Sequence, residues 1–144
     1  MSLRALMRAV NDKWKEEPDL TEVMTGGLWA NVAPSTVVMP YCAFFVLSGR
    51  APQYMFDAGD TQNNRLENPV VQFSIFDPSP EEVILLADLL KRRFDHAELA
   101  YTELKEITHA GCQRLNYGFL VQDPDKSWHF TVDYHISYQE AFSS

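Results

Sequence analysis

Cysteines, basic residues and long apolar runs are all scarce in this sequence. Cys42 and Cys112 are the only two cysteines and form no CxxC pair, so neither a disulfide scaffold nor a cysteine zinc site is expected. No stretch approaches the roughly 20 apolar residues of a membrane span. Arg4 and Arg8 interrupt the N-terminal apolar residues too early for a signal peptide. We therefore expect a soluble protein with reduced, buried thiols that is made in the cytoplasm.

The shortage of positive charge limits the partners that the surface can attract. The chain has 12 Lys and Arg residues against 20 Asp and Glu residues, which gives a formal net charge of −8. Such a surface repels phosphates and anionic lipids, so we expect neither sequence-specific nucleic acid binding nor membrane binding. With 144 residues, 46% of them hydrophobic, the chain can bury one core, and we expect a single domain over residues 1–144.

Motifs for covalent or phosphate chemistry are also absent. The sequence contains no G-x-S-x-G nucleophile turn, no G-x-G-x-x-G and no phosphate-binding P-loop. Neither cysteine has a base next to it in the sequence, and the adjacent Glu81 and Glu82 suit the start of a helix. We therefore predict a protein that is not an enzyme and that carries no cofactor.

Two segments have the residue spacing of amphipathic helices. The first ends before Pro18, and its apolar stripe consists of Leu3, Leu6, Met7, Val10 and Trp14. The second begins with a capping Ser79, Pro80 at the first helical position and Glu82 three residues after the cap. Its stripe consists of Val83, Leu86, Ala87, Leu90 and Phe94. Because the two stripes have the same spacing, we expect both helices to pack on one side of a sheet.

The rest of the sequence favours strands. We expect a short strand within 25–34, longer ones over 40–49 and 68–77, and a pair over 104–108 and 112–120 with a bulge at Gly111. A turn over 123–126 leads to a last strand over 128–138. These elements predict an α+β fold, a mostly antiparallel sheet of about five strands with two amphipathic helices packed on one face.

The last strand raises a question about metal binding. His129, Asp133 and His135 share one face of it, and Asp133 and His135 are about 6.6 to 6.8 Å apart. That pair could ligate a metal if His96 or His109 supplied a third ligand, whereas His129 is roughly 13 Å along the strand from Asp133. A small metal-dependent enzyme using Asp133 and His135 is therefore an alternative. The competing interpretation is a solvated polar face, and it assigns no metal.

The other face of that strand is apolar. Its stripe consists of Trp128, Phe130, Val132, Tyr134, Ile136 and Tyr138. We expect it to hold the strand against the two helices.

A long irregular loop over 49–68 contains the main candidate interface. Tyr54, Met55 and Phe56 interrupt otherwise polar residues there, and Arg50 and Arg65 lie on either side. Apolar clusters in a loop either fold back onto the core or contact a partner. Both interpretations stay open, and these five residues are the candidate interface.

The order of the segments is similar to that of a known family. After the N-terminal helix come TGGLWANVAPSTVVMPYCAFFVLSG, VVQFSIFD, EEVILLADLLKRRF and GFLVQDPDKSWHFTVDYHISYQE. This order resembles the tail completion, tail terminator and head-tail joining proteins of long-tailed bacteriophages and prophages, over nearly the whole chain. The VAP…PY segment and the Asp-Tyr-x-Ile-x-Tyr ending carry most of the resemblance.

The resemblance implies a structural part of the virion. Its members assemble as homo-oligomeric rings, commonly hexamers, between the head connector and the tail tube, where they end tube growth and join the parts. Their expected partners are tail tube and head connector proteins, and no catalytic residues are transferred. A bacterial protein-binding module unrelated to phage is a further alternative.

Overall fold

The computed structural model describes residues 3–48, 69–99 and 107–140. Three helices lie in these ranges: α1 (Leu3–Lys15), α2 (Pro18–Val23) and α3 (Pro80–Phe94). The six strands are β1 (Leu28–Ala30), β2 (Tyr41–Ser48), β3 (Pro69–Asp77), β4 (Ile107–Arg114), β5 (Phe119–Gln122) and β6 (Trp128–Glu140). The α+β prediction is confirmed, with one strand and one helix more than expected.

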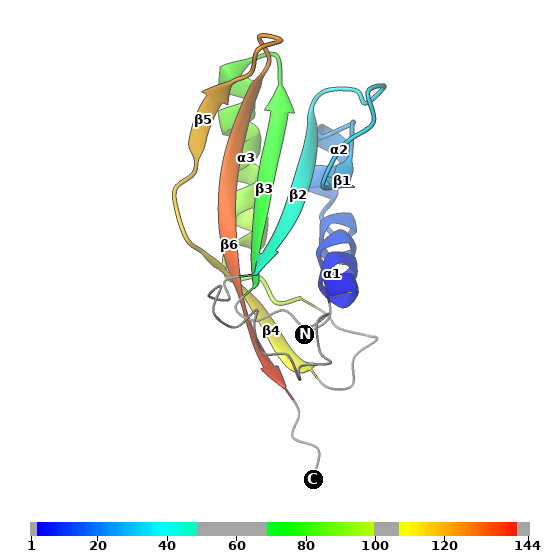
Figure 1. The fold of residues 1–144 in the computed structure, drawn as a ribbon, viewed down its shortest axis with the longest axis vertical. Helices are drawn as coiled ribbons and strands as arrows, with labels where there is room; N and C mark the ends of the chain where they lie inside the picture. Colours follow the sequence, from blue (N-terminus) through cyan, green and yellow to red (C-terminus); the bar gives the residue numbers. More distant parts are fainter. Residues whose placement is uncertain (1–2, 49–68, 100–106, 141–144) are drawn as a thin grey trace, which may run out of the picture.

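The strands form one mixed sheet in the order β1-β2-β3-β6-β4. Only β1 and β2 run parallel, and every other neighbouring pair is antiparallel. The long β6 pairs with β3 along one edge, while its other edge is shared by β5 at the start and β4 at the end (Figure 1). The sheet therefore has β1 at one side and β5 with β4 at the other.

The helices cover one face of this sheet. Helix α3 packs on β3 and β6, and α1 and α2 lie toward β1 and β2 (Figure 1). All five residues of the predicted α3 stripe are buried, as are Leu6, Val10 and Trp14 of α1. The prediction was wrong for Leu3, which is exposed, whereas Ala5 and Ala9 are buried beside the stripe.

Aromatic rings meet at the centre of the core. The Phe73 ring of β3 lies 4.8 Å from that of Phe94 and 5.9 Å from that of Tyr134. The predicted apolar side of β6 is confirmed here, because Tyr134, Val132 and Ile136 are fully buried. Burying a side chain of this size contributes about 1.5–3 kcal/mol, so the contacts between β3, β6 and α3 dominate the stability of the layer.

Local signals explain where two helices begin. The Oγ atom of Ser79 accepts the backbone N–H of Glu82 at 3.4 Å, and Pro80 occupies the first turn of α3. Pro18 ends the run of α1 as predicted, but it also starts the six-residue α2, which the sequence analysis missed. A proline in a helix interior would lose a hydrogen bond and clash with the preceding turn, so α1 does not continue through Pro18. In the first turn of a helix the N–H is unpaired in any case, so Pro18 suits the start of α2.

The strand expected over 112–120 is interrupted, and Gly118 shows why. Its φ of 91° is a left-handed conformation, and a Cβ on it would lie 2.2 Å from a ring atom of Phe130. The chain therefore turns over 115–118 and re-enters the sheet as β5. The bulge expected at Gly111 was also wrong, because Gly111 pairs in register with Ser137 and the irregularity lies between Ile107 and His109.

Two further expectations concern the ends of these strands. The turn over 123–126 is confirmed by a hydrogen bond from the backbone N–H of Lys126 to the oxygen of Asp123 at 2.9 Å. Residues 104–106, where a strand was expected to begin, lie outside the described ranges. Within those ranges no helix has the length and hydropathy to cross a membrane.

Candidate interaction surfaces

Asp133 and His135, the pair of the alternative metal-site interpretation, lie on the sheet face that points away from the helices. Asp133 of β6 lies opposite Gln72 of β3, and His135 lies opposite Val70. Across residues 3–48, 69–99 and 107–140, no three His, Cys, Asp or Glu side chains are grouped so that they could hold a metal ion. His96 is exposed just after α3, and the side chain of His109 lies outside the described part. Among the described side chains, none is thus brought to the pair as a third ligand.

Asp133 instead holds the chain between β4 and β5. Its Oδ2 accepts the side-chain amide of Asn116 at 3.0 Å, and its backbone N–H donates to Oδ1 of Asn116 at 3.2 Å. The backbone N–H of Leu115 donates to the Asp133 carbonyl at 2.9 Å. The side chain of Asn116 thus makes the hydrogen bonds to Asp133 that a neighbouring strand would otherwise make. The other carboxylate oxygen of Asp133 is buried without a hydrogen-bond partner.

His129 is held by a carboxylate and by aromatic rings. Its Nδ1 lies 2.9 Å from both oxygens of Asp123, and its ring lies 5.2 Å from the Phe76 ring. Phe76 stacks in turn on Tyr41 at 4.7 Å, so three rings form a row across β6, β3 and β2. Burial raises the pKa of Tyr41, and the carboxylates of Asp123 and Asp125 raise it further. These contacts fix the end of the sheet beside the β5–β6 turn.

The two cysteines belong to the core. Cys42 and Cys112 are buried, and burial raises the pKa of the Cys112 thiol to about 12. The pKa of Cys42 is raised for the same reason. Both thiols stay protonated at neutral pH, which removes the thiolate that a nucleophile needs. The prediction that they fill the core is confirmed.

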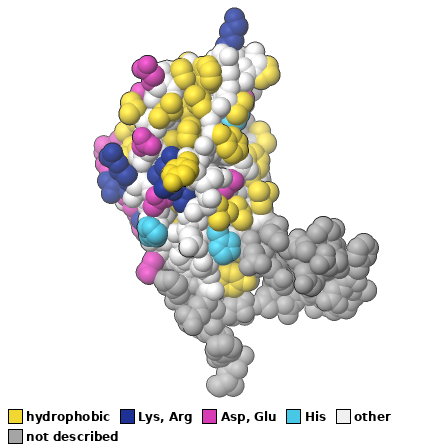
Figure 2. Space-filling model, turned by 90° about the vertical axis from the view of Figure 1, so that its left-hand side faces the viewer, with side chains coloured by type: hydrophobic (Ala, Val, Ile, Leu, Met, Phe, Trp, Pro, Cys, Tyr) yellow, Lys and Arg dark blue, Asp and Glu magenta, His cyan; other side chains and the backbone are white. Residues whose placement is uncertain are grey.

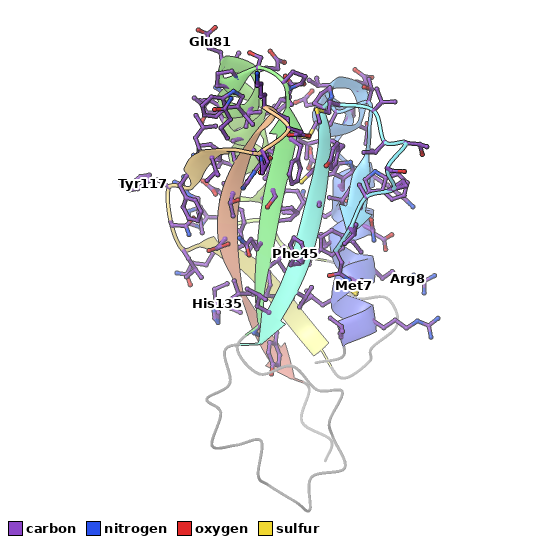
Figure 3. All side chains as sticks on the ribbon, turned by 45° about the horizontal axis from the view of Figure 1, so that its top comes forward. Met7, Arg8, Phe45, Glu81, Tyr117 and His135 are labelled. Carbon is purple, nitrogen blue, oxygen red and sulfur yellow. The ribbon has the colours of Figure 1, made fainter. Side chains whose placement is uncertain are left out.

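We call the side of β2, β3 and β6 opposite the helices the open face. No helix within the described ranges covers it, and Phe45 and His135 lie on it (Figure 3). At its centre lie the small, buried side chains of Ser74 and Thr131, whose hydroxyl oxygens are 3.3 Å apart. Phe45 and Leu47 expose 37% and 49% of their surface on the β2 part of this face. The open face is therefore apolar toward β2 and polar toward β6.

A second apolar surface lies along the edge that carries β5, and it adjoins the open face because Phe119 and Val121 pair with Thr131 and His129 and so lie on the same side of the sheet. Every second residue there is a large exposed hydrophobic side chain: Leu115, Tyr117, Phe119 and Val121. We call these four the β5 side. Tyr117 exposes 83% of its surface, and the Arg114 guanidinium lies 5.5 Å from its ring centroid. Figure 2 shows hydrophobic side chains gathered over this edge of the molecule.

A third apolar surface lies at the opposite end of the sheet. It consists of Val23, Trp29, Val32 and Val38, which we call the β1 side. Val32 is the second residue after the end of β1 and is 78% exposed. The carbonyl of Val38 lies against Gly26, where a Cβ would meet it at 1.8 Å, so the 31–40 segment returns to the start of β1. Groups of exposed apolar side chains mark interaction sites in soluble proteins.

The candidate interface predicted from the sequence lies elsewhere in the chain. Arg50, Tyr54, Met55, Phe56 and Arg65 lie outside the described residues, so that interface stays a prediction. The β5 side was missed, although the uncharged segment LNYGFLVQ over 115–122 already alternates large apolar residues with smaller or polar ones. From the sequence, that alternation predicts one continuous strand over 112–120 and not a separate strand at the edge of the sheet.

No protein-family model matches the chain, and no curated protein matches it either. The likeness to phage tail completion and terminator proteins therefore rests on the segments quoted above and on the order in which they occur.

Proposed function

We propose that the protein is a non-enzymatic structural component of a phage or prophage tail. It assembles as a homo-oligomeric ring at the head-tail junction or the tail end, where it terminates the tail and joins it to its neighbours. One observation carries the proposal: exposed apolar side chains lie on the open face of a single sheet and at both of its ends, on the β5 side and the β1 side.

The size of the exposed side chains supports self-assembly. Aromatic side chains bury about 150–250 Å² each when they are enclosed, and apolar area contributes roughly 25 cal/mol per Å². Four large side chains on each of two surfaces can therefore form the apolar centre of a stable interface. An enzyme of this size would instead be expected to gather polar groups in a pocket.

The acidic balance supports a position around DNA. A ring built from copies with a net charge of −8 repels the phosphates that pass through it. This repulsion keeps the passing DNA from adhering to the wall of the channel. It agrees with the expectation that the protein does not bind nucleic acid sequence-specifically.

Light scattering coupled to gel filtration tests the proposal. We expect one oligomer of fixed mass over a wide concentration range, little changed by high salt because apolar contacts are not screened. The same oligomer should co-elute with the tail tube or head connector protein encoded beside it. A strict monomer at high concentration that binds neither protein contradicts the proposal.

A further inference from the structure

The β5 side and the β1 side lie at opposite ends of the same sheet (Figure 1). They differ in construction, because the first is an edge strand with its preceding turn and the second is a short strand with a returning segment. Two unlike surfaces on one molecule can each contact the other surface on a neighbouring copy. Such head-to-tail contacts produce rings when the rotation between copies closes.

Both sides are free of charged residues. No Asp, Glu, Lys or Arg occurs from Val23 through Ser48, or from Leu115 through Gln122, although such residues make up 22% of the chain. A contact between the two sides therefore encloses no charged residue belonging to either side, which would cost several kcal/mol per ion. Arg114, whose guanidinium lies 5.5 Å from the Tyr117 ring, is already paired with Asp95 at 3.4 Å. It also brings no acidic groups together in a molecule whose net charge is −8. The uncharged surface that each side needs as its partner is present on the same chain.

The direction of the strands allows the two sides to meet as neighbours in one extended sheet. Strand β1 is parallel to β2, and three successive antiparallel pairings then lead through β3 and β6 to β5. It follows that β5 runs antiparallel to β1, in one copy and between copies placed side by side. The segment FLVQ of β5 also lacks the Lys or Pro residues that usually protect an edge strand from pairing.

We propose that the β5 side of one copy docks on the β1 side of a second copy, so that copies join head to tail. This inference rests on the proposed ring and names the contact that builds it. Tyr117 and Phe119 insert among Val32, Val38 and Trp29 of the neighbour. The part of the open face around Phe45 and Leu47 then remains available for other proteins.

Two blocked variants and their mixture test this contact. Tyr117→Glu/Phe119→Glu blocks only the β5 side, and Val32→Glu/Val38→Glu blocks only the β1 side. All four residues are exposed, so both variants should keep the wild-type circular dichroism spectrum. If a double variant fails to fold, Tyr117→Glu or Val32→Glu alone replaces it. Leu85→Glu, on the exposed surface of α3, is the matched control.

Native mass spectrometry should find each blocked variant as a monomer and Leu85→Glu at the wild-type mass. The mixture of the two blocked variants should form a heterodimer and nothing larger, because one intact β5 side and one intact β1 side remain. The inference is overturned if either blocked variant keeps the wild-type mass, or if the mixture stays monomeric while the wild type assembles. A wild-type monomer would instead refute the proposed ring itself.

Discussion

Asn116 completes the hydrogen bonding of β6 at the point where neither β4 nor β5 lies beside it. The two hydrogen bonds between Asn116 and Asp133 join residues 17 positions apart, across a turn whose course depends on the left-handed Gly118. Spacing along the strand offered Asp133 as a metal ligand beside His135 only as an alternative, and the hydrogen-bond partner of Asp133 comes from another segment. The role of a carboxylate on a strand face can be assigned only when the segment beside that strand is known.

The buried thiols give a pH dependence at the same scale. The ordinary pKa of a cysteine is about 8.5 in an unfolded chain, and burial raises that of Cys112 to about 12 in the folded protein. The folded state therefore keeps protons that the unfolded state loses, and stability falls as the pH rises above about 8.5. Each thiol should contribute a slope of up to about 1.4 kcal/mol per pH unit.

Urea unfolding at pH 7.5, 9 and 10 measures this slope, and because the tyrosines of the unfolded chain also ionise near pH 10, it is compared with the slope of a variant without thiols. The Cys42→Ala/Cys112→Ala variant will be less stable at neutral pH, but its free energy of unfolding should fall less steeply between pH 9 and 10. Equal slopes for the two proteins would contradict the burial of both thiols.

At the scale of elements, two neighbouring residues of α3 lie on opposite sides of the helix, one in the core and one at the surface. Leu86 is 2% exposed and faces the sheet, whereas its neighbour Leu85 is 63% exposed. We expect Leu86→Ala to lower the free energy of unfolding by about 2–5 kcal/mol through the lost contacts and the cavity. Leu85→Ala should change it by no more than about 0.5 kcal/mol.

Urea denaturation of both variants should be carried out in the Tyr117→Glu/Phe119→Glu background, so that assembly does not add to the measured stability. Similar losses for the two leucines would mean that α3 does not pack on β3 and β6 through the stripe containing Leu86.

Helix α3 was predictable because its signals are local. The Ser79 cap, Pro80 and the spacing of the stripe all lie within one segment. Strand β5 was not predictable as a separate element, because it depends on how Gly118 fits against Phe130 of another strand. Helix α2 was missed for a different reason: Pro18 is equally compatible with the end of one helix and the start of the next.

At the scale of the whole molecule, the asymmetry of the sheet is the feature that matters most. One face is closed by helices, the other has none over it in the described residues, and the two ends carry different uncharged apolar surfaces. An acidic chain with such ends can join copies without bringing charge together. The proposed role in a phage or prophage tail needs this kind of repeated, directional contact.

Electron microscopy of the negatively stained wild-type protein tests this central claim most directly. If copies join through the β5 side and the β1 side, class averages should show closed rings of one size with a central opening. Particles that appear only as monomers or as compact two-fold dimers at every concentration would contradict it.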